Sequence, residues 1–92
     1  MKTFEEWKAS LQVKLDKLRA MRGQRGYDRA RLSIILTLLN IADWSKSAAE
    51  AVDWIDGKYD LVEEHRTNLD HPDAAPFIRD IRHIAESEAK VC

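Results

Sequence analysis

Residues 32–42 read LSIILTLLNIA, and this stretch decides the fold. Its polar residues, Ser33, Thr37 and Asn40, are four and then three positions apart, so on a helix they lie in one narrow strip. The other eight residues are apolar and cover roughly two-thirds of the circumference, far more than the single apolar stripe of a surface helix. A buried strand is the alternative interpretation, but such strands usually have only about 4 to 8 residues and this stretch is longer. The pattern therefore predicts a central helix over 28–43 that several neighbours cover.

The sequence before the central helix predicts another helix over 4–22. Thr3 and Glu6 have the spacing of a capping box, and apolar residues then recur at intervals of three and four. Gly23 suits the left-handed residue that follows many helices, and Asp28 can cap the central helix. A short polar turn should therefore join these two helices into an antiparallel hairpin.

Beyond the central helix, the spacing predicts one continuous helix over 47–68. Ser47 and Glu50 offer a second capping box at its start. A four-three spacing is kept by Ala48, Val52, Ile55, Tyr59, Val62, Arg66 and Leu69. An interior glycine costs about 1 kcal/mol relative to alanine but does not by itself end a helix. We therefore expect the helix to continue through Gly57.

The sequence LDHPDAAP at 69–76 marks the clearest break, because its prolines lack the amide donor that a helix interior needs. Asp73 can cap a last helix over 74–90, with Pro76 in its first turn. The prediction is an all-α fold, a compact antiparallel four-helix bundle, with helices at 4–22, 28–43, 47–68 and 74–90. The 92 residues are expected to form a single helical domain, 1–92.

The composition favours a soluble protein of the cytoplasm. Charged residues make up 34% and hydrophobic residues 45% of the chain, as in folded globular domains. The longest apolar run has about half of the length that crosses a bilayer, and the sequence opens without a signal-peptide pattern. Cys92 is the only cysteine, which excludes an internal disulfide. We expect a cytoplasmic location and no membrane partner.

The net charge of −1 hides two halves of opposite sign. Between positions 8 and 31, eight basic residues stand against two acidic ones, a net charge of +6. Between positions 43 and 73, nine acidic residues stand against three basic ones, a net charge of −6. The chain is therefore a charge dipole along its sequence, and each half suggests a different partner.

The acidic half places a column of like charge on the outer side of the helix predicted over 47–68. Its members are Glu50, Asp53, Asp56, Asp60, Glu63 and Glu64. Acidic residues four positions apart destabilise an isolated helix by roughly 0.2 to 0.5 kcal/mol per pair. The column is either a solvated face, partly paired with arginines of the other helices, or a docking surface for a basic partner.

Beside the column, Trp54, Leu61 and His65 align at spacings of seven and four. Trp54 is either an anchor for a partner, as tryptophan often is at interfaces, or a ring on the rim of the core. The predicted partner-binding residues are Asp53, Trp54, Asp56, Asp60, Leu61, Glu64 and His65. Trp7 is in phase with the core face of its helix, and Trp44 is expected at the corner between the helices 28–43 and 47–68.

The basic half gives an alternative function at the turn GQRG, residues 23–26. A small nucleic-acid-binding protein would use Arg19, Arg22, Arg25, Tyr27 and Arg29 here. The arginines would contact phosphates and the tyrosine would stack on a base. The sequence pI of about 6.3 and the acidic half, which repels nucleic acid, make this the second choice.

Catalytic and metal-binding patterns are sparse. Arg66 and His71 have the R-x4-H spacing, which resembles that of the helical HEPN-type ribonucleases. This resemblance would imply a ribonuclease activity, which is the remote alternative for this chain. His65, His71 and His83 lack the spacing of metal ligands on helices. We therefore expect no enzyme, no catalytic residues, no metal and no cofactor.

The sequence thus predicts a non-enzymatic protein-protein interaction module, a monomer or dimer that docks on a larger protein or complex. A small regulator or inhibitor is the role that we expect. By analogy alone, stand-alone proteins of this size often come from phages or mobile elements and act on host machinery such as a defence nuclease complex.

Overall fold

Helices are the only regular structure in the computed structural model, which describes residues 2–91 and leaves Met1 and Cys92 outside the described residues. The elements are α1 (Phe4–Ala20), α2 (Arg29–Trp44), α3 (Ala48–Ile55), α4 (Glu63–Asp70), the 3₁₀ turn η1 (Pro72–Ala74) and α5 (Ala75–Val91). The all-helical prediction is confirmed. The four-helix antiparallel bundle is not, because residues 2–91 form five α-helices.

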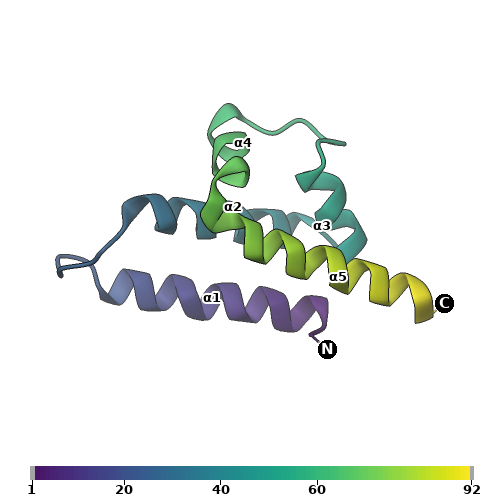
Figure 1. The fold of residues 1–92 in the computed structure, drawn as a ribbon, viewed down its shortest axis with the longest axis horizontal. Coiled ribbons are helices and arrows are strands. Elements are labelled where there is room, and N and C mark those ends of the chain that lie inside the picture. Colours follow the sequence, from purple (N-terminus) through teal and green to yellow (C-terminus); the bar gives the residue numbers. More distant parts are fainter. Residues whose placement is uncertain (1, 92) are drawn as a thin grey trace.

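Helices α1 and α2 lie side by side and form a hairpin (Figure 1). The Thr3 hydroxyl accepts a hydrogen bond from the Glu6 amide and the Glu6 carboxylate accepts one from the Thr3 amide, which completes the predicted capping box. The Asp28 carboxylate accepts from the amides of Ala30 and Arg31 and begins α2 as predicted. Local capping therefore sets both helix starts.

The core is formed mainly by buried side chains of α1, α2, α3 and α5. Its largest fully buried side chains include Trp7, Leu11, Ile34, Leu38 and Ile81. The Trp7 indole N–H also donates to the carbonyl of Phe77 at 3.1 Å, so a buried ring ties α1 to α5. The predicted core position of Trp7 is confirmed.

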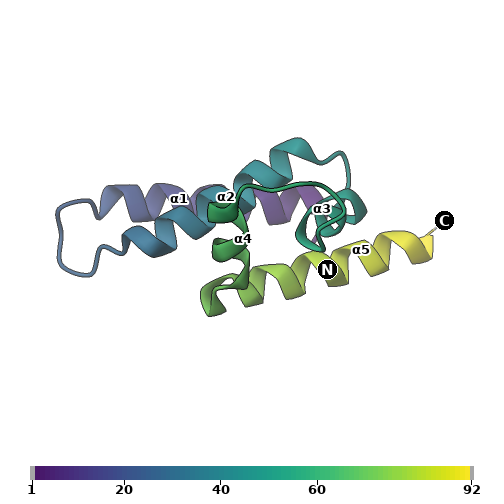
Figure 2. The same cartoon turned by 90° about the horizontal axis from the view of Figure 1, so that it is seen from above.

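The continuous helix predicted over 47–68 is wrong, because the chain leaves the helical path near Gly57. This glycine has φ +89°, a left-handed conformation that a helix interior does not contain. A connection then leads to α4, which is separate from α3 in Figure 1 and packs on α2 in Figure 2. Tyr59 and Val62, which the spacing placed on a core stripe, are exposed. The preserved spacing across the glycine was therefore not the spacing of one helix.

The start of α5 also differs from the prediction. His71, and not Asp73, caps this region, because its Nδ1 accepts a hydrogen bond from the Asp73 amide and begins η1. The turn η1 leads directly into α5, where Pro76 is the second residue and needs no amide donor. From there α5 packs on α3 and α1. Among the described residues, no helix is long and apolar enough to cross a membrane.

Candidate functional site

Four aromatic rings meet at the end of α2, and we call them the aromatic cluster: Trp44, Trp54, Tyr59 and His65. The ring of Trp54 lies between those of Trp44 and Tyr59, with centroids 5.0 and 4.4 Å apart. The His65 ring meets Trp44 edge-on at 6.0 Å. These separations are those of interacting aromatic pairs. The rings come from α2, α3, the α3–α4 connection and α4, so the break at Gly57 is what gathers them.

Part of the cluster is open to solvent. Trp44 is 45% exposed and Tyr59 is 36% exposed, and Val62, three positions after Tyr59, is 62% exposed. Among the described residues, the only other large hydrophobic side chain with comparable exposure is Val13 on α1. Exposed apolar side chains that gather in one region mark interaction sites, whereas scattered ones do not.

Trp54 is the inner ring of the cluster. It is partly buried and packs against the core. Its Nε1 is buried and has no hydrogen-bond acceptor among the described residues. An unsatisfied buried donor costs about 1 to 3 kcal/mol. Because Trp54 packs against the core and contacts both Trp44 and Tyr59, it supports these two outer rings. Trp44 and Tyr59 are the rings that a partner would meet first.

A polar network behind the cluster fixes α4 on α2. The Asn68 amide donates to the hydroxyls of Thr37 and Ser33 at 2.9 and 3.1 Å. A hydrogen bond of 2.9 Å also joins the Thr37 hydroxyl to His65 Nδ1. Thr37 is buried, so part of the polar strip of the central helix serves to dock α4 and does not face water. His65 links this network to the rings.

The α3–α4 connection is held by Arg66. Its guanidinium donates to the carbonyl of Tyr59 at 3.3 Å. The same group lies 3.2 Å from the place where a Cβ on Gly57 would stand, a tight contact that the guanidinium would have to relieve, and the positive φ at this position favours glycine. Arg66 therefore lies beside the turn at Gly57 and binds the backbone of Tyr59.

The acidic residues divide into paired and unpaired ones. Asp56 forms a two-point ion pair with Arg82 of α5, with distances of 3.1 and 2.5 Å. The hydrogen bonds from Arg82 lower the pKa of the Asp56 carboxyl below its ordinary value of about 3.8. Asp53 pairs with Lys58 at 3.5 Å. Within residues 2–91, no ion pair involves the exposed acids Asp60, Glu63 and Glu64.

The predicted partner-binding residues do not form a column on one helix. Trp54 and His65 both contact Trp44 in the aromatic cluster, and Leu61 packs against the core. The acids are spread over three elements: Glu50 and Asp53 on α3, Asp56 and Asp60 in the connection, and Glu63 and Glu64 in the first turn of α4. Sequence reasoning missed Tyr59 as a site residue and left Trp44 outside the site. An aromatic residue two positions after Gly57 was the available signal.

The alternative nucleic-acid site lies at the opposite end of the hairpin (Figure 1). Arg19, Arg22, Arg25 and Arg29 are all exposed there, and Tyr27 is partly buried. None of these arginines takes part in an ion pair within the described part of the chain. The turn itself depends on positive φ at Gly23 and Gly26.

Arg66 and His71, which carry the R-x4-H spacing, each bind a backbone group: the Tyr59 carbonyl and the Asp73 amide. Within residues 2–91, no three His, Cys, Asp or Glu side chains are grouped so that they could hold a metal ion. No family model matches this chain, and no curated protein or solved structure matches it either.

Proposed function

We propose that this chain is a protein-binding module that docks on a larger partner through the aromatic cluster and the acids beside it. The observation that carries the proposal is the exposure of Trp44 and Tyr59 on a braced support, next to the unpaired acids Asp60, Glu63 and Glu64. A regulator or inhibitor of the partner is the role that we propose for it.

The chemistry of this surface fits a basic segment of the partner. An arginine guanidinium over the face of a tryptophan or tyrosine gains about 0.5 to 2 kcal/mol. The unpaired acids would speed the encounter with such a segment, since complementary rim charges act mainly on association. Tryptophan and tyrosine are also the residues that most often dominate interface energies.

A labelled arginine-rich peptide tests the proposal by fluorescence polarisation. The double variant Trp44→Ala with Tyr59→Ala should raise the Kd about tenfold or more, because it removes both exposed rings. Val13→Ala is the matched control, since it truncates an exposed hydrophobic residue on α1 away from the cluster. Circular dichroism must show that each variant remains folded.

A second experiment tests the contribution of the unpaired acids. The triple variant combines Asp60→Lys, Glu63→Lys and Glu64→Lys in one chain, and Asp16→Lys on α1 is the control. The triple variant should slow association strongly, and the effect should shrink with added salt.

Equal peptide affinity in wild type and the ring variant would contradict the proposal. Binding of single-stranded RNA or DNA that Arg22→Glu, Arg25→Glu and Arg29→Glu abolish would favour the alternative function at the hairpin tip.

A further inference from the structure

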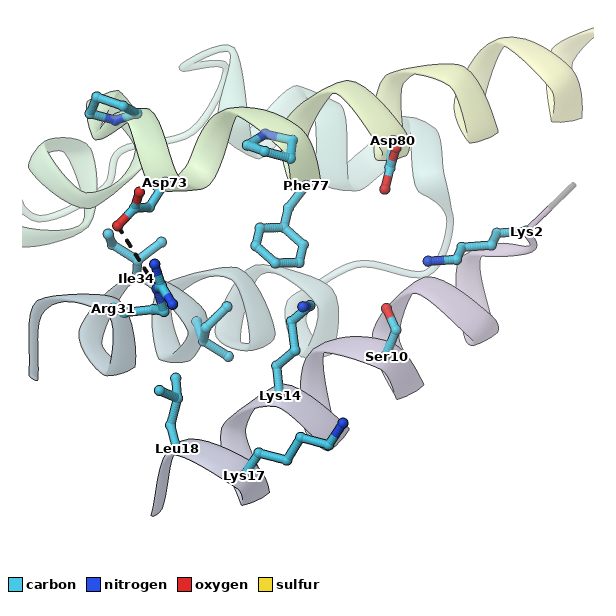
Figure 3. A pocket seen from close by; sticks show the side chains of 13 residues that line it. Lys2, Ser10, Lys14, Lys17, Leu18, Arg31, Ile34, Asp73, Phe77 and Asp80 are labelled. Carbon is cyan, nitrogen blue, oxygen red and sulfur yellow. Dashed lines mark ion pairs between the residues drawn. The ribbon is translucent and has the colours of Figure 1, made fainter. Parts of the chain in front are cut away.

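A groove separate from the aromatic cluster lies between α1, α2 and the beginning of α5 (Figure 3). Its volume is about 570 Å³, within the roughly 300 to 1,000 Å³ of small-molecule sites. Its lining comes from Lys2, Ser10, Lys14, Lys17, Leu18, Arg31, Ile34, Ile35, Pro72, Asp73, Pro76, Phe77 and Asp80. We call it the α1–α5 groove.

The inner side of the α1–α5 groove is apolar. Leu18 of α1 and Ile34 and Ile35 of α2 are core residues that also line it. Phe77 is only partly buried, and its ring projects from α5 between the two walls (Figure 3). A hydrocarbon or aromatic group placed here would contact carbon on several sides.

Charged side chains line the groove along its length, and an ion pair forms among them. At one end Arg31 pairs with Asp73 at 4.0 Å. At the other end Lys2 and Asp80, both among the described residues, carry opposite charges on opposite walls and do not form an ion pair with each other (Figure 3). Lys14 and Lys17 lie between these ends. Neither has an ion-pair partner in the described part of the chain.

Lys14 shows how charge and apolar surface combine. Its Nζ lies 5.5 Å from the centroid of the Phe77 ring. An ammonium over a ring face remains able to bind an anion, because the ring attracts the cation without neutralising it. An anion held by Lys14 and Lys17 would therefore place any attached apolar group next to Phe77 and Leu18.

We propose that the α1–α5 groove binds a small amphipathic anion, which has one carboxylate or phosphate and a short hydrocarbon or aromatic body. The lysines in the middle of the groove receive the anion and the apolar lining receives the body. An inorganic anion would leave the apolar lining unused, and a neutral hydrocarbon would leave the lysines unused. The α1–α5 groove contains none of the four rings of the aromatic cluster, so this proposal does not rest on the proposed function.

Decanoate, below its micellar concentration, is the probe for a titration followed by amide NMR shifts. We expect saturable shifts centred on Lys14, Lys17 and Phe77, without shifts at Trp54 or Tyr59. Acetate has the anion without the body, and decanol has the body without the anion. Each should bind at least about tenfold more weakly, because each uses only one half of the groove.

The double variant Lys14→Gln with Lys17→Gln should raise the Kd of decanoate about tenfold or more. Lys46→Gln with Lys90→Gln makes the same charge change outside the groove and should leave the Kd unchanged. Undiminished binding to the Lys14 and Lys17 variant, equal binding of decanol, or a collapse of the dispersed spectrum would overturn the proposal. So would binding of a glutamate-rich peptide in the groove when decanoate gives no shifts, since the groove would then be a protein interface.

Discussion

The two ends of α2 carry charged surfaces of different construction. At the hairpin tip, the exposed arginines stand on a short turn held by backbone hydrogen bonds such as those from Gln24 to Met21 and from Tyr27 to Gln24. At the other end, the aromatic cluster is held by ring contacts, by the network around Thr37, and by Arg66. A surface that is already ordered loses less conformational freedom when it binds. This difference favours the aromatic cluster as the docking site over the tip.

The largest effect should come from the network that docks α4. Asn68→Ala removes the amide that donates to the Thr37 and Ser33 hydroxyls, so it should lower the free energy of unfolding by about 1 to 3 kcal/mol. Urea denaturation measures this change. Thr67→Ala is the matched control, because Thr67 is exposed and its hydroxyl only donates to the Glu63 carbonyl of the same helix. Equal losses in both variants would show that the network does not hold α4.

A somewhat smaller effect on stability should distinguish the turn at Gly57 from the hairpin tip at Gly23. Gly57→Ala forces a Cβ into a left-handed conformation and toward the Arg66 guanidinium, and should cost about 1 to 2 kcal/mol. Gly23→Ala at the tip has a similar φ of +83° but nothing within 4 Å, so it should cost only about 1 kcal/mol. Thermal melts of both variants give the comparison. A stabilised Gly57→Ala variant would mean that α3 extends through this position.

These two turns also show what the sequence can and cannot predict. The start of α2 at Asp28 depends on contacts within a few residues, and its capping pattern predicted it. Gly23 has the predicted left-handed φ, but α1 ends at Ala20, before the predicted end at residue 22. The break at Gly57 depends on the docking of α4, in which Asn68 meets Thr37 across 31 positions. No local pattern contains that contact. The spacing of apolar residues therefore favoured one helix where tertiary contacts produce two.

The candidate site was predictable only in part, for the same reason. Trp54 and His65 were chosen because they share a face on a continuous helix, and they do lie in one cluster, but Trp44 is the ring that joins them. Tyr59 reaches Trp54 because the chain turns back after Gly57. Ring contacts of this kind follow from the path of the connection, which the helical spacing did not reveal.

A smaller effect concerns the ion pair of Asp56 with Arg82. Because this pair lowers the pKa of Asp56 in the folded chain, its stabilisation is complete above the ordinary pKa near 3.8 and is lost as the pH falls through the folded value. Asp56→Asn should cost less than about 1 kcal/mol at neutral pH, since the pair is exposed. The difference from wild type in urea denaturation should vanish at acidic pH. Asp60→Asn is the control and should show no such pH-dependent difference; a difference that persists in acid would rule out the ion pair as the cause.

The smallest effect on stability should come from the hairpin tip. Arg22→Glu, Arg25→Glu and Arg29→Glu in one chain change three exposed side chains, and the free energy of unfolding should stay within about 0.5 kcal/mol of wild type. The changes at Arg22 and Arg29 should have opposite effects on stability. A negative charge is unfavourable near the carboxyl end of α1 and favourable near the amino end of α2. Urea denaturation checks the stability, and the arginine-rich peptide should bind the variant at least as well as wild type, because its net charge is more negative. Lost peptide binding with intact stability would place the docking surface at the tip, and lost stability would show that the tip is held by more than its backbone turn.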